Sequence, residues 1–168
     1  MLLDNLSRSK VGGRIINAVA DPRAFYLIWP PYALEFYDPS RPYNQLQAYI
    51  KSKLAIALST KAYNAYARDN KLNVSVFSVD PGVMDPSKGR NTSPIFKAVL
   101  SSLPKFLFKS FEQGAETAVH CATASGLEQE SGGFFQNCKQ IRTPSRINDY
   151  AMAQRLWTTS MDLVKPYL

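Results

Sequence analysis

Two strand-like runs flank one long helix-like segment between residues 13 and 82, and this order constrains the fold more than any other feature of the chain. The first run, GRIINAVA at 13–20, is compact, apolar and rich in isoleucine and valine, which suits a buried strand. Residues 44–69 carry apolar side chains at helical spacing, and NVSVFSVDPG at 73–82 is a second strand that Pro81-Gly82 ends. A strand–helix–strand order predicts parallel strands joined by a right-handed crossover.

The remaining segments extend this α/β pattern. MLLDNLSRSK is typical of a helix end before Gly12-Gly13, GGFFQNC at 132–138 of a strand, and residues 113–125 and 150–164 of helices. We therefore predict a single α/β domain over 1–168, with a thin parallel sheet of about three strands and flanking helices. The strand around Ile15 is expected at an uncovered edge of this sheet, as in the second half of a larger domain.

Composition and charge exclude several classes of protein. The chain has 168 residues, and 45% of them are hydrophobic, which is enough for one domain with a real core. Its formal charge of +7 comes from Lys and Arg spread along the chain without a block of like charges. We therefore expect a basic solvated surface and no nucleic-acid partner.

Metal sites, disulfide frameworks and membrane spans are also not expected. Cys121 and Cys138 lie far apart in the sequence, and His120 is the only histidine, so we interpret His120 and Cys121 as structural. No apolar run reaches the roughly 18–20 residues of a membrane span. The first residues lack the pattern of a secretion signal. These features favour an intracellular protein, either cytoplasmic or peripheral on an intracellular membrane.

Candidate chemistry lies in QAYIKSKLAIAL at 47–58, where Tyr49 and Lys53 are one helical turn apart and share a face. A nearby ammonium favours the phenolate and lowers the pKa of a tyrosine from its ordinary value near 10. Such a phenol can exchange a proton with an alcohol or carbonyl oxygen. On spacing alone, a core tyrosine beside a solvated surface lysine is the more economical interpretation.

The wider context resembles the short-chain dehydrogenase/reductase family, in its retinol dehydrogenase and WW-domain oxidoreductase branch. The resemblance is carried by stretches that follow in the same order along nearly the whole chain: MLLDNLSRSKVGGRIINAV, AYIKSKLA, NVSVFSVDPGVM, QGAETAVHCATA, LEQESGGFFQNCK and AQRLWTTSMDLV. It covers only the C-terminal half of the family pattern. It implies a partial Rossmann-type, doubly wound parallel sheet, and alcohol–carbonyl interconversion that uses NAD or NADP.

The resemblance also implies roles for particular residues. Tyr49 is the expected catalytic acid/base, and Lys53 is expected to lower the pKa of Tyr49 and to bind the nicotinamide ribose. The turn Pro81-Gly82-Val83 is expected to lie against the nicotinamide. Residues 84–111 are expected to form an excursion that covers a small lipid-like or retinoid-like substrate.

The family pattern is broken at two kinds of position. Ala20 stands where a serine hydroxyl polarises the substrate oxygen, and losing one such donor costs about two to three powers of ten in rate. Pro86 stands where the family has a threonine. None of the eight glycines falls in the glycine-rich spacing that approaches a dinucleotide phosphate. We therefore expect weak binding of NAD or NADP by this chain alone, and impaired or incomplete activity, as in a truncated enzyme or pseudoenzyme.

The rival hypothesis is a non-catalytic interaction remnant of the same fold, which forms a homo- or heterodimer through the helix of Tyr49. A separate feature is the basic amphipathic segment IFKAVLSSLPKFLFKSF at 95–111. It is either a lid or core helix, or a peripheral contact with an anionic membrane. Because prolines interrupt it, we expect this segment to be more mobile than the helix at 44–69.

Overall fold

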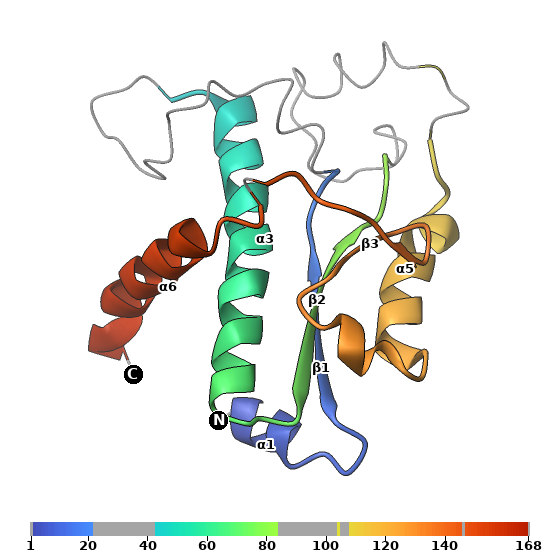
Figure 1. Ribbon diagram of the computed structural model, residues 1–168. Helices are drawn as coiled ribbons and strands as arrows, with labels where there is room; N and C mark the ends of the chain where they lie inside the picture. The colour runs from blue at the N-terminus through green and yellow to red at the C-terminus, as the bar shows by residue number, and fades with distance from the viewer. Residues whose placement is uncertain (1, 22–42, 84–103, 105–107, 146, 168) are drawn as a thin grey trace.

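The computed structural model of the chain describes residues 2–21, 43–83, 104, 108–145 and 147–167 (Figure 1). Its helices are α1 (Leu2–Ser7), α3 (Gln45–Asp69), α5 (Phe111–Thr123) and α6 (Tyr150–Val164), with short 3-10 turns η3 (Leu127–Glu130) and η4 (Lys165–Tyr167). Its strands are β1 (Gly13–Ala18), β2 (Val74–Asp80), β3 (Phe134–Gln136) and β4 (Lys139–Gln140).

The described strands form one sheet in the order β1-β2-β3-β4. β1, β2 and β3 run parallel, and Gly13 to Ala18 of β1 lie opposite Val74 to Val79 of β2. The predicted α/β class and the parallel pairing of the first two strands are therefore confirmed. Within the described part of the chain, β1 pairs with β2 alone, so the edge predicted around Ile15 is present.

The short strand β4 differs from the prediction, which continued the third strand to residue 138. The strand ends at Gln136, and Asn137 and Cys138 both have positive φ, at 52° and 57°. Two left-handed residues in a row match the right-handed twist of a two-residue hairpin. The chain therefore turns back, and β4 pairs antiparallel with β3.

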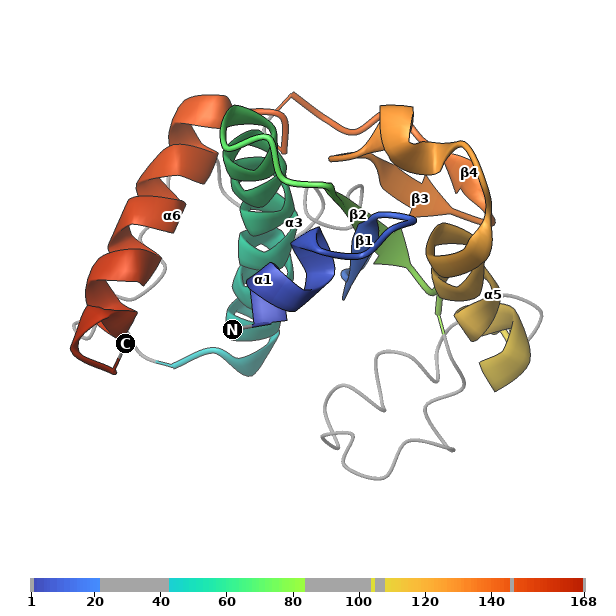
Figure 2. The same ribbon diagram turned by 90° about the horizontal axis from the view of Figure 1, so that it is seen from below.

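Helices cover both faces of the sheet, with α3 and α6 on one side and α5 on the other (Figure 2). Every residue of β2 is buried, as expected of a strand packed on two faces. The α5 side is filled by Phe77, Val79, Cys121, Leu127 and Phe135. The α3 side is filled by Val19, Ile50, Leu54, Ala57, Leu58, Ala62, Phe134, Ile147, Met152 and Ala153.

Helix α3 begins at a side-chain cap and packs against α6. The Asn44 side chain accepts a hydrogen bond from the Gln47 amide, which satisfies one of the free N–H groups at the helix start. The Trp157 ring of α6 lies 5.5 Å from that of Tyr63 and 5.8 Å from that of Tyr66. Helix α6 therefore covers part of the α3 surface that the rival hypothesis assigns to a dimer partner.

A buried polar contact fixes α3 against the sheet. The Thr60 hydroxyl accepts hydrogen bonds from Asn17 Nδ2 of β1 at 3.0 Å and from Ser78 Oγ of β2 at 2.9 Å. It donates in turn to the carbonyl of Ile56 at 3.0 Å. One hydroxyl thus joins three elements, and its directional bonds set the position of the helix along the strands.

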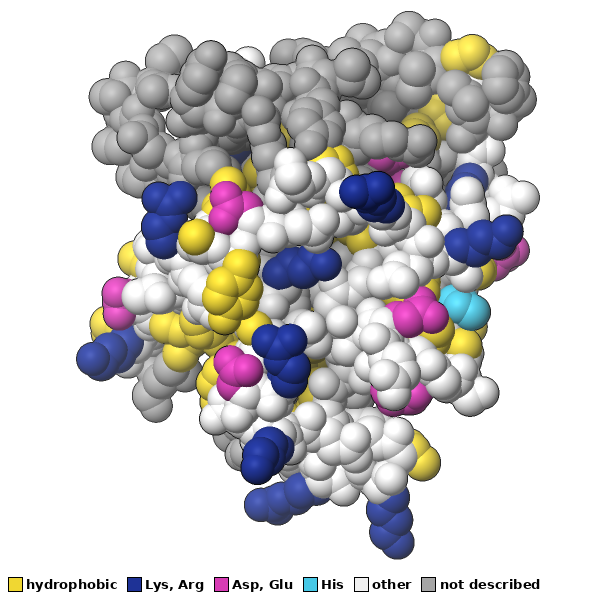
Figure 3. Space-filling view, in the orientation of Figure 1, with side chains coloured by type: hydrophobic (Ala, Val, Ile, Leu, Met, Phe, Trp, Pro, Cys, Tyr) yellow, Lys and Arg dark blue, Asp and Glu magenta, His cyan; other side chains and the backbone are white. Residues whose placement is uncertain are grey.

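Positive side chains on the face drawn in Figure 3 are scattered, with acidic and neutral groups between them. None of the helices in the described residues is long and apolar enough to cross a membrane. Most of the 84–111 excursion lies outside the described residues, and so does most of the basic segment 95–111. Its predicted mobility and membrane contact therefore remain predictions.

Candidate active site at the carboxyl edge of the sheet

The candidate residues meet where β1, β2 and β3 end. Ligands of open α/β sheets bind beyond the carboxyl ends of the parallel strands. The first turns of α3 reach the same edge, because the Lys53 ammonium donates a hydrogen bond to the carbonyl of Ala18, the last residue of β1, at 3.2 Å. The helix carrying the tyrosine–lysine pair is therefore joined to the functional end of the sheet.

The pair itself shares one face of α3, as its spacing predicts. The Lys53 ammonium lies 5.7 Å from the centroid of the Tyr49 ring, within reach of a cation–π contact. Tyr49 is 41% exposed, which argues against the interpretation as a core tyrosine. Its side chain is therefore partly exposed near the end of β1, to which Lys53 is bonded.

The pKa of Tyr49 moves in the opposite direction to the one that the resemblance implies. Burial raises it, and the negative charge of Asp80 raises it further. Both effects disfavour the phenolate. Burial and Asp80 account for this shift, and the lowering that we expect from Lys53 stays a prediction.

The turn after β2 depends on a glycine. Gly82 has a φ of +81°, a conformation that favours glycine. The Asp80 carboxylate accepts a hydrogen bond from the Gly82 amide at 2.8 Å, which closes the turn on itself. Val83 follows with 39% of its surface exposed, so this turn presents an apolar side chain at the edge.

Lys109 contacts both Gly82 and Val83 of this turn. Its amide donates to the Val83 carbonyl at 2.9 Å, and its ammonium donates to Asn137 Oδ1 at 2.5 Å. Its aliphatic stem packs on Gly82, since a Cβ placed there would meet the Lys109 stem at 2.9 Å. Lys109 therefore links the turn after β2 to the hairpin after β3.

The pattern-based prediction missed Asp80, Gln136 and Lys109. The Gln136 amide donates to the Asp80 carboxylate at 2.6 Å and to that of Asp21 at 3.4 Å. Asp80 was visible as the residue before Pro81-Gly82, but its partner lies 56 positions away and only the β2–β3 register brings the two together. Short sequence patterns carry no signal for such a contact.

Ala20, Cys121 and His120 make packing contacts. Ala20 packs against the cluster on the α3 side and offers no hydroxyl. Cys121 is fully buried, and burial raises the pKa of its thiol to about 11, which leaves it unreactive. The His120 ring lies 6.4 Å from that of Phe135. Among the described residues, no group of three or more His, Cys, Asp and Glu side chains is placed to hold a metal ion.

Curated relatives match between 70% and 98% of the chain, although no protein-family model matches it. Short-chain dehydrogenase TIC 32 A of Brassica napus is 31% identical over 98% of this chain and 52% of its own length. Retinol dehydrogenase 13 of Homo sapiens is 34% identical over 98% of this chain and 49% of its own length. Retinol dehydrogenase 12 of Mus musculus is 38% identical over 70% of this chain and 36% of its own length.

Solved structures share the fold. An uncharacterized protein from Mycobacterium Paratuberculosis aligns with a TM-score of 0.60 and 19% identity, over 90% of this chain and 50% of its own. The NADPH-bound carbonyl reductase from chicken fatty liver aligns with a TM-score of 0.50 and 16% identity, over 84% and 47%. The chain spans about half the length of the curated relatives it matches. It belongs to the short-chain dehydrogenase/reductase family and corresponds to a part of the longer retinol dehydrogenase-like pattern.

Proposed function

We propose that this chain carries the proton-transfer part of an NAD(P)-dependent oxidoreductase site that interconverts an alcohol and a carbonyl. The single observation that carries the proposal is the placement of Tyr49 and Lys53 together at the carboxyl edge of the sheet, with Lys53 bonded to Ala18. The retinol dehydrogenases among its relatives favour a lipid-like or retinoid-like substrate.

In this proposal, Tyr49 donates its phenolic proton to the carbonyl oxygen of the substrate, or takes a proton from the alcohol in the reverse direction. Lys53 fixes the approach of α3 to the strand ends through its bond to Ala18. The bound nicotinamide supplies or accepts the hydride. Because Tyr49 is partly exposed, we expect a substrate oxygen to reach the phenol without a rearrangement of α3.

The described residues fit the nicotinamide end of such a cofactor. An ammonium has three N–H donors, and the Ala18 carbonyl takes one from Lys53, which leaves donor capacity for ribose hydroxyls. Pro81, Gly82 and the exposed Val83 supply an apolar surface for a flat ring. The sequence has no glycine-rich turn for the phosphates, so we expect weak cofactor binding by residues 1–168 alone, and a calorimetric titration with NADPH measures it.

The decisive experiment joins this chain to the preceding half of a related dehydrogenase and follows NADPH-dependent reduction of a retinoid-like aldehyde. We expect a low rate that Tyr49→Phe abolishes and that Ala20→Ser raises about a hundredfold, the usual effect of one positioned hydrogen-bond donor. Tyr66→Phe is the matched control, since Tyr66 lies on the same helix and is 40% exposed. Equal rates for the two tyrosine variants would refute the catalytic role of Tyr49.

A further inference from the structure

Lys109 contacts two separate turns at the carboxyl edge of the sheet. Its amide donates to the Val83 carbonyl at 2.9 Å, and its ammonium donates to Asn137 Oδ1 at 2.5 Å. The same side chain crosses Gly82, because a Cβ on that residue would lie 2.9 Å from the Lys109 Cδ and Cε atoms. The glycine is therefore required for packing against Lys109 as well as for its φ of +81°.

The backbone of Lys109 is held by the start of α5. The next residue, Ser110, accepts a hydrogen bond from the Gln113 amide at 3.2 Å through its hydroxyl. The Gln113 side chain accepts in turn from the Ser110 amide at 3.0 Å, which completes a capping box. The contacts of Lys109 therefore begin at an ordered helix end and do not depend on a flexible side chain alone.

The hairpin after β3 is joined to the same helix. Asn137 has a φ of 52°, and the amide of the following Cys138 donates to the Thr117 hydroxyl of α5 at 3.3 Å. Thr117 is 1% exposed, so this bond is shielded from water. Helix α5 thus contacts the hairpin directly at Thr117, and the bond from Lys109 to Asn137 connects the helix start to it a second time.

We propose that Lys109 is a positioning residue that holds the turn Pro81-Gly82-Val83 in the place where a nicotinamide ring lies against it. This inference rests on the proposed oxidoreductase function. Asp80 restrains the turn from the side of β2, through the bond from the Gly82 amide. Lys109 restrains it from the side of α5. Loss of the Lys109 side chain gives the turn and its 39% exposed Val83 freedom that cofactor binding must then remove.

The expected effect is on cofactor binding rather than on proton transfer. Lys109 bonds to Val83 and Asn137, whereas the proposed proton-transfer pair, Tyr49 and Lys53, lies on α3. A typical net hydrogen bond changes an equilibrium constant about threefold to tenfold. We therefore expect a loss of this size in the affinity for NADPH, with little change in kcat, which is the pattern of lost uniform binding.

Hydrogen exchange measured by nuclear magnetic resonance tests the contact in residues 1–168 without any cofactor. The amide of residue 109 donates to Val83, so its protection reports whether the turn stays in place. Lys109→Met keeps an unbranched side chain over Gly82 but loses the bond to Asn137, and protection at residue 109 should fall about threefold to tenfold. Lys139→Met, at an exposed residue of the same hairpin, is the matched control and should leave it unchanged.

Two results of this measurement would overturn the role of Lys109. An unprotected amide at residue 109 in the folded wild-type chain refutes it, even if the variant does not fold. Equal protection in wild type and in folded Lys109→Met refutes it as well.

The fused enzyme tests the consequence for the cofactor. Lys109→Met should raise the dissociation constant and the KM for NADPH about threefold to tenfold, with kcat within about twofold of the parent fusion. A lower kcat with unchanged affinity for NADPH would refute a role in positioning the cofactor turn, and a folded fusion that does not bind NADPH would refute both proposals. An inactive fusion in which Lys109→Met still weakens NADPH binding would refute the proposed function alone.

Discussion

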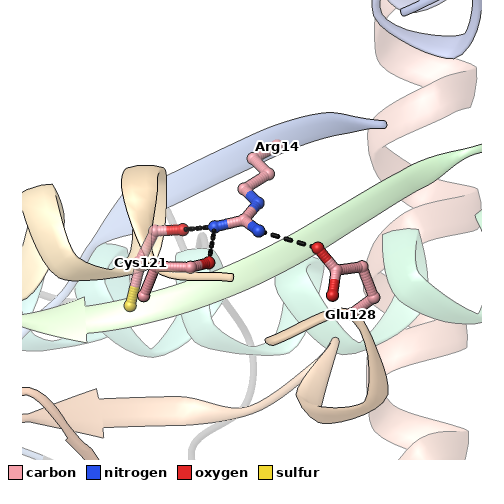
Figure 4. Close-up of polar contacts among 4 residues, drawn as sticks. Arg14, Cys121 and Glu128 are labelled. Atoms are coloured by element: carbon pink, nitrogen blue, oxygen red, sulfur yellow. Dashed lines mark hydrogen bonds and ion pairs between the residues drawn. The ribbon is translucent and has the colours of Figure 1, made fainter. Parts of the chain in front are cut away.

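Arg14 is the residue whose loss we expect to damage this fold most directly. Its guanidinium reaches from β1 to the end of α5, where Nη1 donates to the carbonyls of Cys121 at 3.0 Å and Ala124 at 2.6 Å (Figure 4). Nη2 donates to the Glu128 carboxylate at 2.7 Å. The side chain is 15% exposed, so these bonds are largely shielded from water.

The expected cost of Arg14→Met follows from these contacts. A hydrogen bond to a charged group contributes about 1.5–3 kcal/mol, and the variant leaves two carbonyls at the negative end of α5 without their cation. The Glu128 side chain is 50% exposed, so water screens its ion pair and the two carbonyl contacts dominate the cost. Because methionine keeps much of the apolar stem, we expect a loss of about 3 kcal/mol in the free energy of unfolding.

Urea unfolding followed by circular dichroism measures this loss. Arg68→Met is the control, because Arg68 pairs with Asp69 at 3.7 Å and both side chains are more than 60% exposed, which predicts a change of less than about 0.5 kcal/mol. Arg14→Lys keeps the charge but loses the planar fork, and should fall between wild type and Arg14→Met. Equal losses for Arg14→Met and Arg68→Met would show that the guanidinium does not stabilise the end of α5.

Three further perturbations test other contacts. Thr60→Val removes a hydroxyl that accepts from two side chains and should cost about 2–3 kcal/mol in urea unfolding, whereas Thr123→Val, at an exposed hydroxyl, should cost less than about 0.5 kcal/mol; similar costs would contradict the buried contact. Gly132→Ala places a Cβ 2.6 Å from the side-chain amide nitrogen of Asn64 in α3, at a residue with a φ of +81°. The melting temperature of this variant should fall well below that of Gly126→Ala, where φ is +80° and no atom lies within 4 Å of the added Cβ. Burial raises the pKa of Cys121 from 9.0 to about 11, so the folded state binds more protons between these values and stability falls as pH rises, by up to about 3 kcal/mol. Cys121→Ala should flatten that decline in urea titrations from pH 8 to 11, and an unchanged slope would exclude this thiol as its source.

The sequence predicted the central strands and helices because their signals are local. The run NVSVFSVDPG is rich in β-formers and ends at a proline and a glycine, and β2 lies within it. The hairpin after β3 was missed because Asn137-Cys138 lacks the glycine that usually marks such a turn. Register was beyond reach as well, since the contact between Asp80 and Gln136 depends on how β2 and β3 align.

Only the local part of the candidate site could be predicted from the sequence. Tyr49 and Lys53 are neighbours on one helix, so their spacing alone gives their common face. Burial raises the Tyr49 pKa most, and Asp80, which belongs to a different element and reaches the site through folding, raises it further. The direction of this shift could therefore not be predicted from the helix spacing alone.

The length of α3 relative to the strands explains why the pair lies at the edge. Its 25 residues span about 37 Å, whereas the seven residues of β2 span about 23 Å, so the helix is longer than the strand it covers. Lys53, the ninth residue of α3, bonds to the last residue of β1, and Tyr49 lies one turn closer to the helix start. The phenol therefore lies beyond the strand ends while Lys53 is anchored to them. A pair placed two turns later would face the sheet at the level of Thr60, where the interior is already filled by Asn17 and Ser78.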